Sequence, residues 1–363
     1  MVNDMGGRDS ASARRGRRAS SGTKLADVAR EASVSIATAS RALSGAPGVS
    51  PEQRKRIVEI AERLQYEHNP IGRSLRSGKT QLIGVWVESI ANNSSARLVS
   101  ALTDALHPHG YDILVTEYSD DAAEDASRIR ALARRRPDYM VVLHPPRPDA
   151  FRAIAERGQE VIMIAGGAPS AWRGPLISVD SVPSRRELAA HLVELGHQRA
   201  LVLLPARRIG RPGSDVLARV VERDKVPLEV DLQPFAGEDR GGPGLKISDV
   251  VALVRSKHGP TFLHVNEAQA PALLKGLTAA GLRIPDDVSV MSTGAPPWAE
   301  IYRPPLSVTD VDYYLCGKRA AELILDLVRG EAPRRRVVKG AYVRRDSVGP
   351  APRRRRTASA ARR

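Results

Sequence analysis

One arginine set among small side chains is the feature of this sequence with the clearest chemistry. In SIATASRAL, residues 35–43, Arg41 stands among Ala, Thr and Ser residues. A helix in the major groove of DNA must approach base edges closely, and small side chains allow this approach. The stretch therefore predicts a DNA-reading helix, although a fragment of an ordinary helical bundle would show the same periodicity.

Positive charge is concentrated at the ends of the chain, whose formal net charge is +15. Residues 1–22 hold five Arg against two Asp, and residues 23–80 hold ten Lys and Arg against six Asp and Glu. Residues 334–363 hold twelve Lys and Arg against one Asp, whereas residues 81–333 hold 29 Lys and Arg against 32 Asp and Glu. A near-neutral body with basic ends favours contact with a polyanion. Arg-rich tails that only aid solubility are the alternative.

The composition argues against catalysis, cofactors and membranes. The eight histidines are scattered, and none is spaced for metal binding with a carboxylate on one helical face. The single cysteine, Cys316, allows no disulfide within the chain and fits a reducing compartment. No apolar run that could act as a secretory signal precedes Leu25. No apolar run in the sequence approaches the length of about 18 residues that a membrane span needs. We therefore expect a cytoplasmic protein that is not an enzyme, binds no cofactor or metal and contacts no membrane.

The elements around SIATASRAL read as three short helices. Residues 25–32 place apolar side chains at helical spacing, and Ser35 fits the N-cap of the next helix. Gly45 and Pro47 end that helix, and the Ser-Pro-Glu-Gln stretch at 50–53 has the pattern of a capping box. Three short helices with a tight turn between the first two predict a helix-turn-helix domain.

The stretch ADVAREASVSIATASRAL…GVSPEQRKRIVEIAERLQY…NPIGRSLRSGKT is similar to the DNA-binding domain of the lactose-repressor (LacI) family of transcription regulators. The elements Asp-Val-Ala, Val-Ser-x-x-Thr-x-Ser-Arg and Arg-Ser-Leu-Arg occur in order at the family spacing. The resemblance implies a helix-turn-helix DNA-binding domain at 23–68 and a hinge helix and linker at 69–80, after a disordered basic tail at 1–22. A plain linker is the alternative for 69–80.

The resemblance also assigns roles to single residues. Arg41 would read a base, and Leu75 would wedge into a central base step from the minor groove and kink the duplex. Lys24 stands where the family usually has Thr, and Ser33 replaces the common turn Gly. The base-contacting positions are Ile36, Ala37, Arg41 and Leu75. The phosphate-contacting positions are Thr23, Lys24, Ser35, Thr38, Ser40, Arg73 and Arg76.

From residue 81 to residue 349, apolar strand-like runs alternate with helical segments, beginning with LIGVWV and ARLVSALTDALHPHG. Such alternation predicts an α/β fold with parallel sheets. The order resembles the two-lobed periplasmic-binding-protein-like domain of the same family. The resemblance implies a lobe one of about 81–179 plus 308–331 and a lobe two of about 180–306 plus 334–349.

The C-terminal end bears on assembly. Residues 350–363 are again basic, and we expect a second disordered tail. The Leu-heptad segment by which the lactose repressor forms tetramers has no counterpart here. We therefore expect a homodimer.

The resemblance weakens between the lobes, where a small effector, a sugar or another metabolite, would bind. The family's Asn-Pro-Phe-Phe element aligns with Asn-Asn-Ser-Ser at 92–95, and its Gly-Phe-Asp-Asp loop aligns with Ser-Thr-Gly-Ala at 292–295. Either the pocket binds a ligand unlike the usual sugars, or it is vestigial and the lobes serve mainly to dimerise. The candidate lining residues are Asn92, Asp180, Arg211, Asn266, Glu267 and Trp298.

Together these features predict a sequence-specific DNA-binding transcription regulator, which we expect to be a repressor. As a homodimer it would bind double-stranded operator DNA with an inverted repeat. An effector would change how the lobes pack, and thereby whether the hinge helices form. An extracytoplasmic solute-binding protein is a further alternative, against which the N-terminal domain argues.

Overall fold

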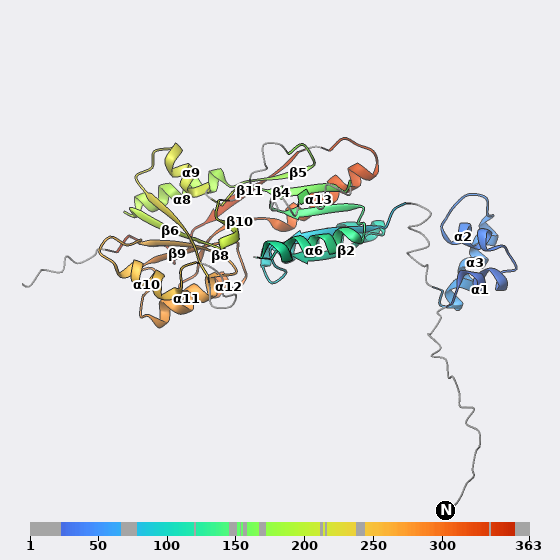
Figure 1. Cartoon of the computed structure of the whole chain (residues 1–363), viewed down its shortest axis with the longest axis horizontal. Coiled ribbons are helices and arrows are strands. Elements are labelled where there is room, and N and C mark those ends of the chain that lie inside the picture. Colours follow the sequence, from blue (N-terminus) through green and yellow to red (C-terminus); the bar gives the residue numbers. More distant parts are fainter. Residues whose placement is uncertain are drawn as a thin grey trace, which may run out of the picture. The chain divides into compact units, whose positions relative to one another are not determined.

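The computed structural model describes two compact units, residues 1–79 and residues 80–363 (Figure 1). The described residues are 23–66, 78–119, 121–144, 151–152, 154, 158–166, 172–210, 213–214, 216–236, 244–333 and 335–352. Leu75, Arg73, Arg76 and Arg211 lie outside them, as do the tails at 1–22 and 353–363.

The first unit contains the three expected helices, α1 (Leu25–Glu31), α2 (Ile36–Leu43) and α3 (Pro51–Arg63). The two predicted serine caps are present: Ser35 Oγ accepts a hydrogen bond from the Thr38 amide at 3.0 Å, and Ser50 Oγ accepts one from the Gln53 amide at 3.2 Å. Ser33, in the turn between α1 and α2, has a φ of 55°. That left-handed conformation favours glycine, so the turn tolerates a side chain at some strain.

A small aliphatic core holds these helices together. Val28 of α1, Ala39 of α2 and Ile57 of α3 are each fully buried. Because the α2 contribution is an alanine, α2 can pack close to the other two helices. Arg54 adds polar contacts to α2. Its guanidinium donates to the carbonyl of Ala42, in the last turn of α2, at 3.1 Å and to the carbonyl of Ala46, just after α2, at 2.6 Å.

The second unit is built on one eleven-stranded arrangement with the order β2-β1-β3-β4-β5-β11-β10-β9-β8-β6-β7. The pairings within β1–β5 and within β6–β10 are parallel, which confirms the expected α/β class. The lobe-one strands are β1 (Leu82–Val87), β2 (Asp112–Glu117), β3 (Tyr139–Leu143), β4 (Glu160–Ala165) and β5 (Leu176–Asp180). The lobe-two strands are β6 (Arg199–Leu204), β7 (Glu229–Pro234), β8 (Phe262–Asn266), β9 (Ser289–Thr293) and β10 (Ser307–Val311).

Strand β11 (Arg336–Val343) joins the two lobes. Its first half pairs in parallel with β5, and its second half, from Gly340, pairs antiparallel with β10. The segment 334–349 is therefore shared between the lobes. The fold also extends beyond 349, because the Ala351 amide donates to the Leu195 carbonyl at 2.8 Å; residues 350–352, assigned to a tail from the sequence, belong to lobe two.

Helices cover both faces of the lobe-one sheet. Helices α5 (Asn93–Leu106) and α13 (Tyr313–Val328) pack on one face, and α6 (Ala122–Arg134) packs on the other. Gly317 of α13 permits the close approach to α5, because a Cβ at this position would lie 2.6 Å from the Leu98 carbonyl oxygen.

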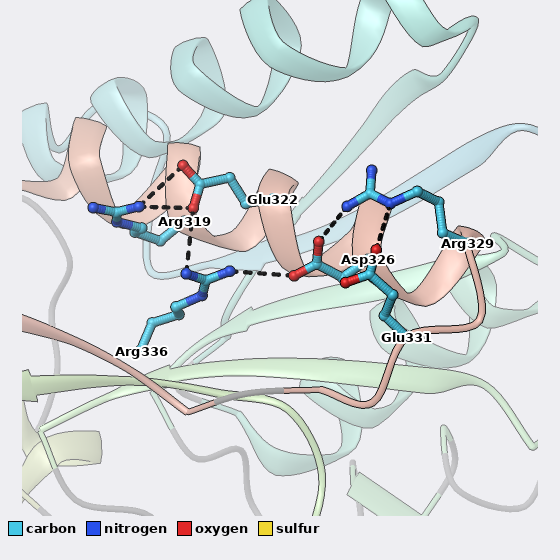
Figure 2. A network of polar contacts seen from close by, with 6 residues as sticks. All are labelled: Arg319, Glu322, Asp326, Arg329, Glu331 and Arg336. Carbon is cyan, nitrogen blue, oxygen red and sulfur yellow. Dashed lines mark hydrogen bonds and ion pairs between the residues drawn. The ribbon is translucent and has the colours of Figure 1, made fainter.

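An ion-pair network ties α13 to β11 (Figure 2). Arg336 of β11 lies 3.2 Å from Asp326 and 3.9 Å from Glu322, both on α13. Asp326 also pairs with Arg329, so one carboxylate serves two arginines. The joining strand is thus fastened to the last helix of lobe one by side chains as well as by its backbone.

Lobe two has the same layering. Helices α8 (Val182–Glu194) and α9 (Val216–Arg223) cover one face, and α10 (Ile247–Arg255), α11 (Ala270–Ala279) and α12 (Trp298–Ile301) cover the other (Figure 1). The short 3₁₀ turns are η1 (His107–His109) and η2 (Ala206–Arg208). None of the described helices is long and apolar enough to cross a membrane.

Candidate DNA-reading helix and inter-lobe cleft

Helix α2 divides its residues between an inner and an outer face. Ala39 and Ala42 are buried against α1 and α3, while Ala37 and Arg41, one turn apart, are exposed on the outside. Ile36, at the start of the helix, is 55% exposed. The outer face thus presents Arg41 beside small and apolar side chains, a surface that can enter a DNA groove.

The proposed phosphate-contacting residues are arranged less uniformly. Lys24, Ser35 and Thr38 lie at or near the N-termini of α1 and α2, where free backbone amides also attract anions. Thr23, by contrast, donates its hydroxyl to the Leu64 carbonyl at 2.7 Å, which ties the start of the unit to the end of α3. Ser40 is only 5% exposed and lies on the inner face of α2.

A cavity of about 140 Å³ lies between the lobes, at the carboxyl ends of the parallel strands. Ligands of open α/β sheets characteristically bind at such an edge. Of the predicted lining residues, Asn92, Asn266 and Glu267 line it. Asn92 is the N-cap residue of α5 in lobe one, Asn266 is the last residue of strand β8 in lobe two, and Glu267 follows it, so the structure brings these three together.

Asp180 and Trp298 do not line this cavity. Asp180 Oδ1 accepts a hydrogen bond from the Val182 amide at 3.2 Å, which turns the carboxylate toward the start of α8. Trp298 follows two prolines and packs against α11, in a surface hollow beside Leu274 and Tyr302. The sequence placed both after strands, but the backbone beyond each strand directs the side chain elsewhere.

The lobes touch where α5 begins. Glu267 Oε1 of lobe two accepts hydrogen bonds from the Ser94 amide, at 3.0 Å, and from the Ser94 hydroxyl. Asn93 Nδ2 donates to the Ala295 carbonyl at 3.4 Å. Burial raises the pKa of Glu267, an effect that the Ser94 hydrogen bonds oppose. The hydrogen bonds from Ser94 to Glu267 link the two lobes at this point.

Several cleft residues were not predicted from the sequence. Glu88 lies between Arg208, at 3.7 Å from its Nε, and His144, at 4.0 Å from its Nε2. His264 is bonded through Nε2 to Thr293 Oγ1 at 2.6 Å, and burial holds its pKa well below the ordinary histidine value.

Arg185 is the most informative of the missed residues. It is 8% exposed, and burial lowers its pKa to about 10. The sequence did contain a signal, because Arg185 precedes the buried residues Leu188 and Ala189 of α8 by three and four positions. Helical periodicity therefore places this arginine on the inward stripe.

Both units match family models. Residues 24–69 match the bacterial regulatory proteins of the lacI family. Residues 80–210 match the periplasmic binding proteins and sugar binding domain of the LacI family, and residues 189–348 match a periplasmic binding protein-like domain. The matches thus run from the first unit through both lobes of the second.

Relatives and solved structures agree with these models. Catabolite control protein A of Staphylococcus xylosus is 24% identical over 307 residues, 84% of this chain and 92% of that protein. Its counterpart from Streptococcus mutans is 25% identical over 314 residues, 84% of this chain and 91% of that protein. The lac repressor dimer bound to operator and the anti-inducer ONPF has a TM-score of 0.73 at 21% identity, covering 90% of this chain and 99% of that one. The chain belongs to the LacI family of DNA-binding transcription regulators, with an N-terminal helix-turn-helix domain followed by a two-lobed periplasmic-binding-protein-like domain.

Proposed function

We propose that this protein is a repressor that binds an inverted-repeat operator as a homodimer and is controlled by a small molecule in the cleft between its lobes. The outer face of α2 carries the proposal, since Ile36, Ala37 and Arg41 are exposed there on a helix whose other face is buried. The lac repressor structure similar to this chain is a dimer bound to operator, which supports the same assembly here.

Individual roles follow from this proposal. Arg41 reads a guanine, Ile36 and Ala37 contact thymine methyl groups or fit against a base, and Leu75 wedges into the central base step. Lys24, Ser35, Thr38, Arg73 and Arg76 contact phosphates. Thr23 and Ser40 contribute mainly to the fold of the unit, because one is bonded to Leu64 and the other is buried.

The proposal includes where the protein acts and what it does not do. Its relatives named above are transcription regulators, so we propose that it has no catalytic activity. A partner that is chromosomal DNA places it in the cytoplasm.

Selection of bound sites from a random DNA pool tests this function directly. We expect a palindromic site with two half-sites, and a steep loss of affinity with added salt because phosphate contacts release counterions. A pool that yields no preferred sequence, or a preferred sequence without two-fold symmetry, would contradict the proposed operator binding.

A regulator with a vestigial cleft is the second candidate. The direct Ser94–Glu267 contact favours it, because this contact links the two lobes without a ligand. Calorimetry with a broad panel of sugars and metabolites separates the two candidates. A tight, saturable ligand that changes operator affinity eliminates the vestigial reading.

A further inference from the structure

A buried cation lies in the cleft, and none of the described residues serves as its counter-ion. The guanidinium of Arg185 belongs to a side chain that is 8% exposed, and its Nη1 has no hydrogen-bond partner. Within the described part of the chain, no hydrogen bond or ion pair engages this group. A buried charge is strongly unfavourable unless it is paired, so the arrangement is incomplete as it stands.

The carboxylates that could neutralise Arg185 are engaged elsewhere. Glu88 is shared between Arg208 and His144, and Glu267 accepts from Ser94. Asp180, at the end of β5, accepts from the backbone of α8. The cleft therefore holds a positive group that the neighbouring acidic side chains do not compensate.

Other groups beside Arg185 could complete a binding site. Tyr313 and His264 line the same cavity as Arg185. The Nδ1 atom of His264 is also buried without a partner. Val202, Leu204 and Leu217 provide apolar walls to the same cavity.

We propose that the cleft takes a small metabolite with a carboxylate or phosphate group, and that Arg185 binds this oxyanion. Arginine is suited to the task because its planar N–H groups match the spacing of carboxylate and phosphate oxygens. This inference rests on the proposed function in one respect only, that the cleft is the effector site.

Matched sets of ligands test the charge requirement. Ribose, ribose 5-phosphate and ribonate, and glucose, glucose 6-phosphate and gluconate, differ mainly in the anionic group. Titration calorimetry of the full chain should show binding by at least one anionic member and none by its neutral parent. Comparing the affinity of the sugar phosphate with that of the sugar carboxylate in each set shows which oxyanion the site prefers. Equal binding of a neutral sugar and its anionic form would overturn the proposal.

Arg185→Gln, with Arg186→Gln as its control, tests the residue. Arg186 is adjacent on α8 but half-exposed and paired with Asp224 at 2.8 Å. We expect Arg185→Gln to weaken binding of the anion at least tenfold, Arg185→Lys to retain part of it, and Arg186→Gln to retain all of it. An anion that binds Arg185→Gln with wild-type affinity would show that Arg185 does not hold it.

A second measurement does not depend on the identity of the metabolite. Thermal melting in buffer without oxyanions should show Arg185→Met more stable than the wild type, because an uncompensated charge has been removed. Inorganic phosphate should raise the melting temperature of the wild type saturably and leave that of Arg185→Met unchanged. If Arg185→Met is less stable and phosphate has no such effect, Arg185 is a structural group and the proposal fails. Operator binding by the wild type, followed by fluorescence anisotropy, separately reports whether the proposed regulatory function holds.

Discussion

The two units of this protein present their chemistry in opposite ways. In the first unit, Arg41 and Ile36 project from the outer face of a helix whose inner face is buried. In the second unit, Arg185, Glu267 and His264 are buried between two lobes and come from elements far apart in the chain. An exposed reading face depends on one helix and its support, whereas a cleft depends on the relative placement of many elements. The predictions that follow probe this difference.

The largest effect is expected from emptying the small core of the first unit. Ile57→Ala should destabilise that unit by about 2–5 kcal/mol, because a fully buried aliphatic side chain is replaced by a cavity. Operator binding should be lost while the melting of the second unit stays unchanged. Calorimetric melting and anisotropy check this. Ile36→Ala serves as the control, since that side chain is exposed and its removal should leave the melting temperature unaltered. If the melting temperatures of both units fell together, the two units would not fold separately.

The corresponding change in the second unit is Gly317→Ala. The added Cβ would lie 2.6 Å from the Leu98 carbonyl oxygen and 2.7 Å from the Ala101 Cβ, so α5 and α13 must move apart. Overpacking of this kind lowers the free energy of unfolding by about 1–3 kcal/mol. The melting transition of the second unit should shift to lower temperature, while that of the first unit stays in place. Lys318→Ala, at the exposed neighbouring position, is the control and should change neither. An unshifted second transition would mean that the helix contact is looser than the structure describes.

Arg41→Ala should affect recognition without affecting folding. Loss of a bidentate arginine–guanine pair costs about 1–3 kcal/mol at one operator position and relaxes specificity there. Arg41 is exposed, so the melting temperature of the first unit should not change. Anisotropy with the selected operator and with its single-base variants measures the effect. If the variant discriminates operator from random DNA as well as the wild type does, Arg41 is not a base reader.

The smallest effect is expected from Glu267→Gln and concerns pH. Burial raises the pKa of the Glu267 carboxyl above its ordinary value of 4.5 in the folded protein. A carboxyl of this kind adds stability below its unfolded pKa, and the contribution is lost as the pH rises through the folded value. The second unit should therefore become less stable as the pH rises above about 4.5.

Glu267→Gln should remove that part of the pH dependence. Urea unfolding at a series of pH values measures it, with Glu229→Gln as an exposed control on strand β7. The same pH profile in wild type and variant would show that Glu267 titrates alike in the folded and unfolded chain.

Prediction from sequence succeeded where the determining contacts are close along the chain. The caps formed by Ser35 and Ser50 bond to amides three residues away, so their patterns could be read directly. The alternation of strands and helices similarly predicted the parallel α/β class. The sharing of β11 between the lobes was not predictable in this way, because it depends on pairing with β5 and β10 at once.

The cleft shows the limit most clearly. Asn92, Asn266 and Glu267 were predicted from the resemblance to the family, and all three line the cavity. Asp180 and Trp298 were also candidates, but neither lines this cavity: Asp180 accepts a hydrogen bond from the start of α8, and Trp298 lies in a surface hollow beside α11. Arg185 was missed although helical periodicity marks it as inward, because an arginine in a charged helix is ordinarily read as exposed.

The sequence by itself determined the family, helix α2 and its supporting caps, and the α/β class of the second unit. These follow from contacts within a few residues and from repeating patterns of apolar side chains. Only the tertiary structure decided which polar groups share the cleft and that Glu267 of lobe two caps α5 of lobe one. It also decided that Arg185 is buried with no counter-ion among the described residues. The physical reason is that burial and charge pairing depend on which distant segments of the chain pack together. A local sequence pattern does not specify those long-range contacts.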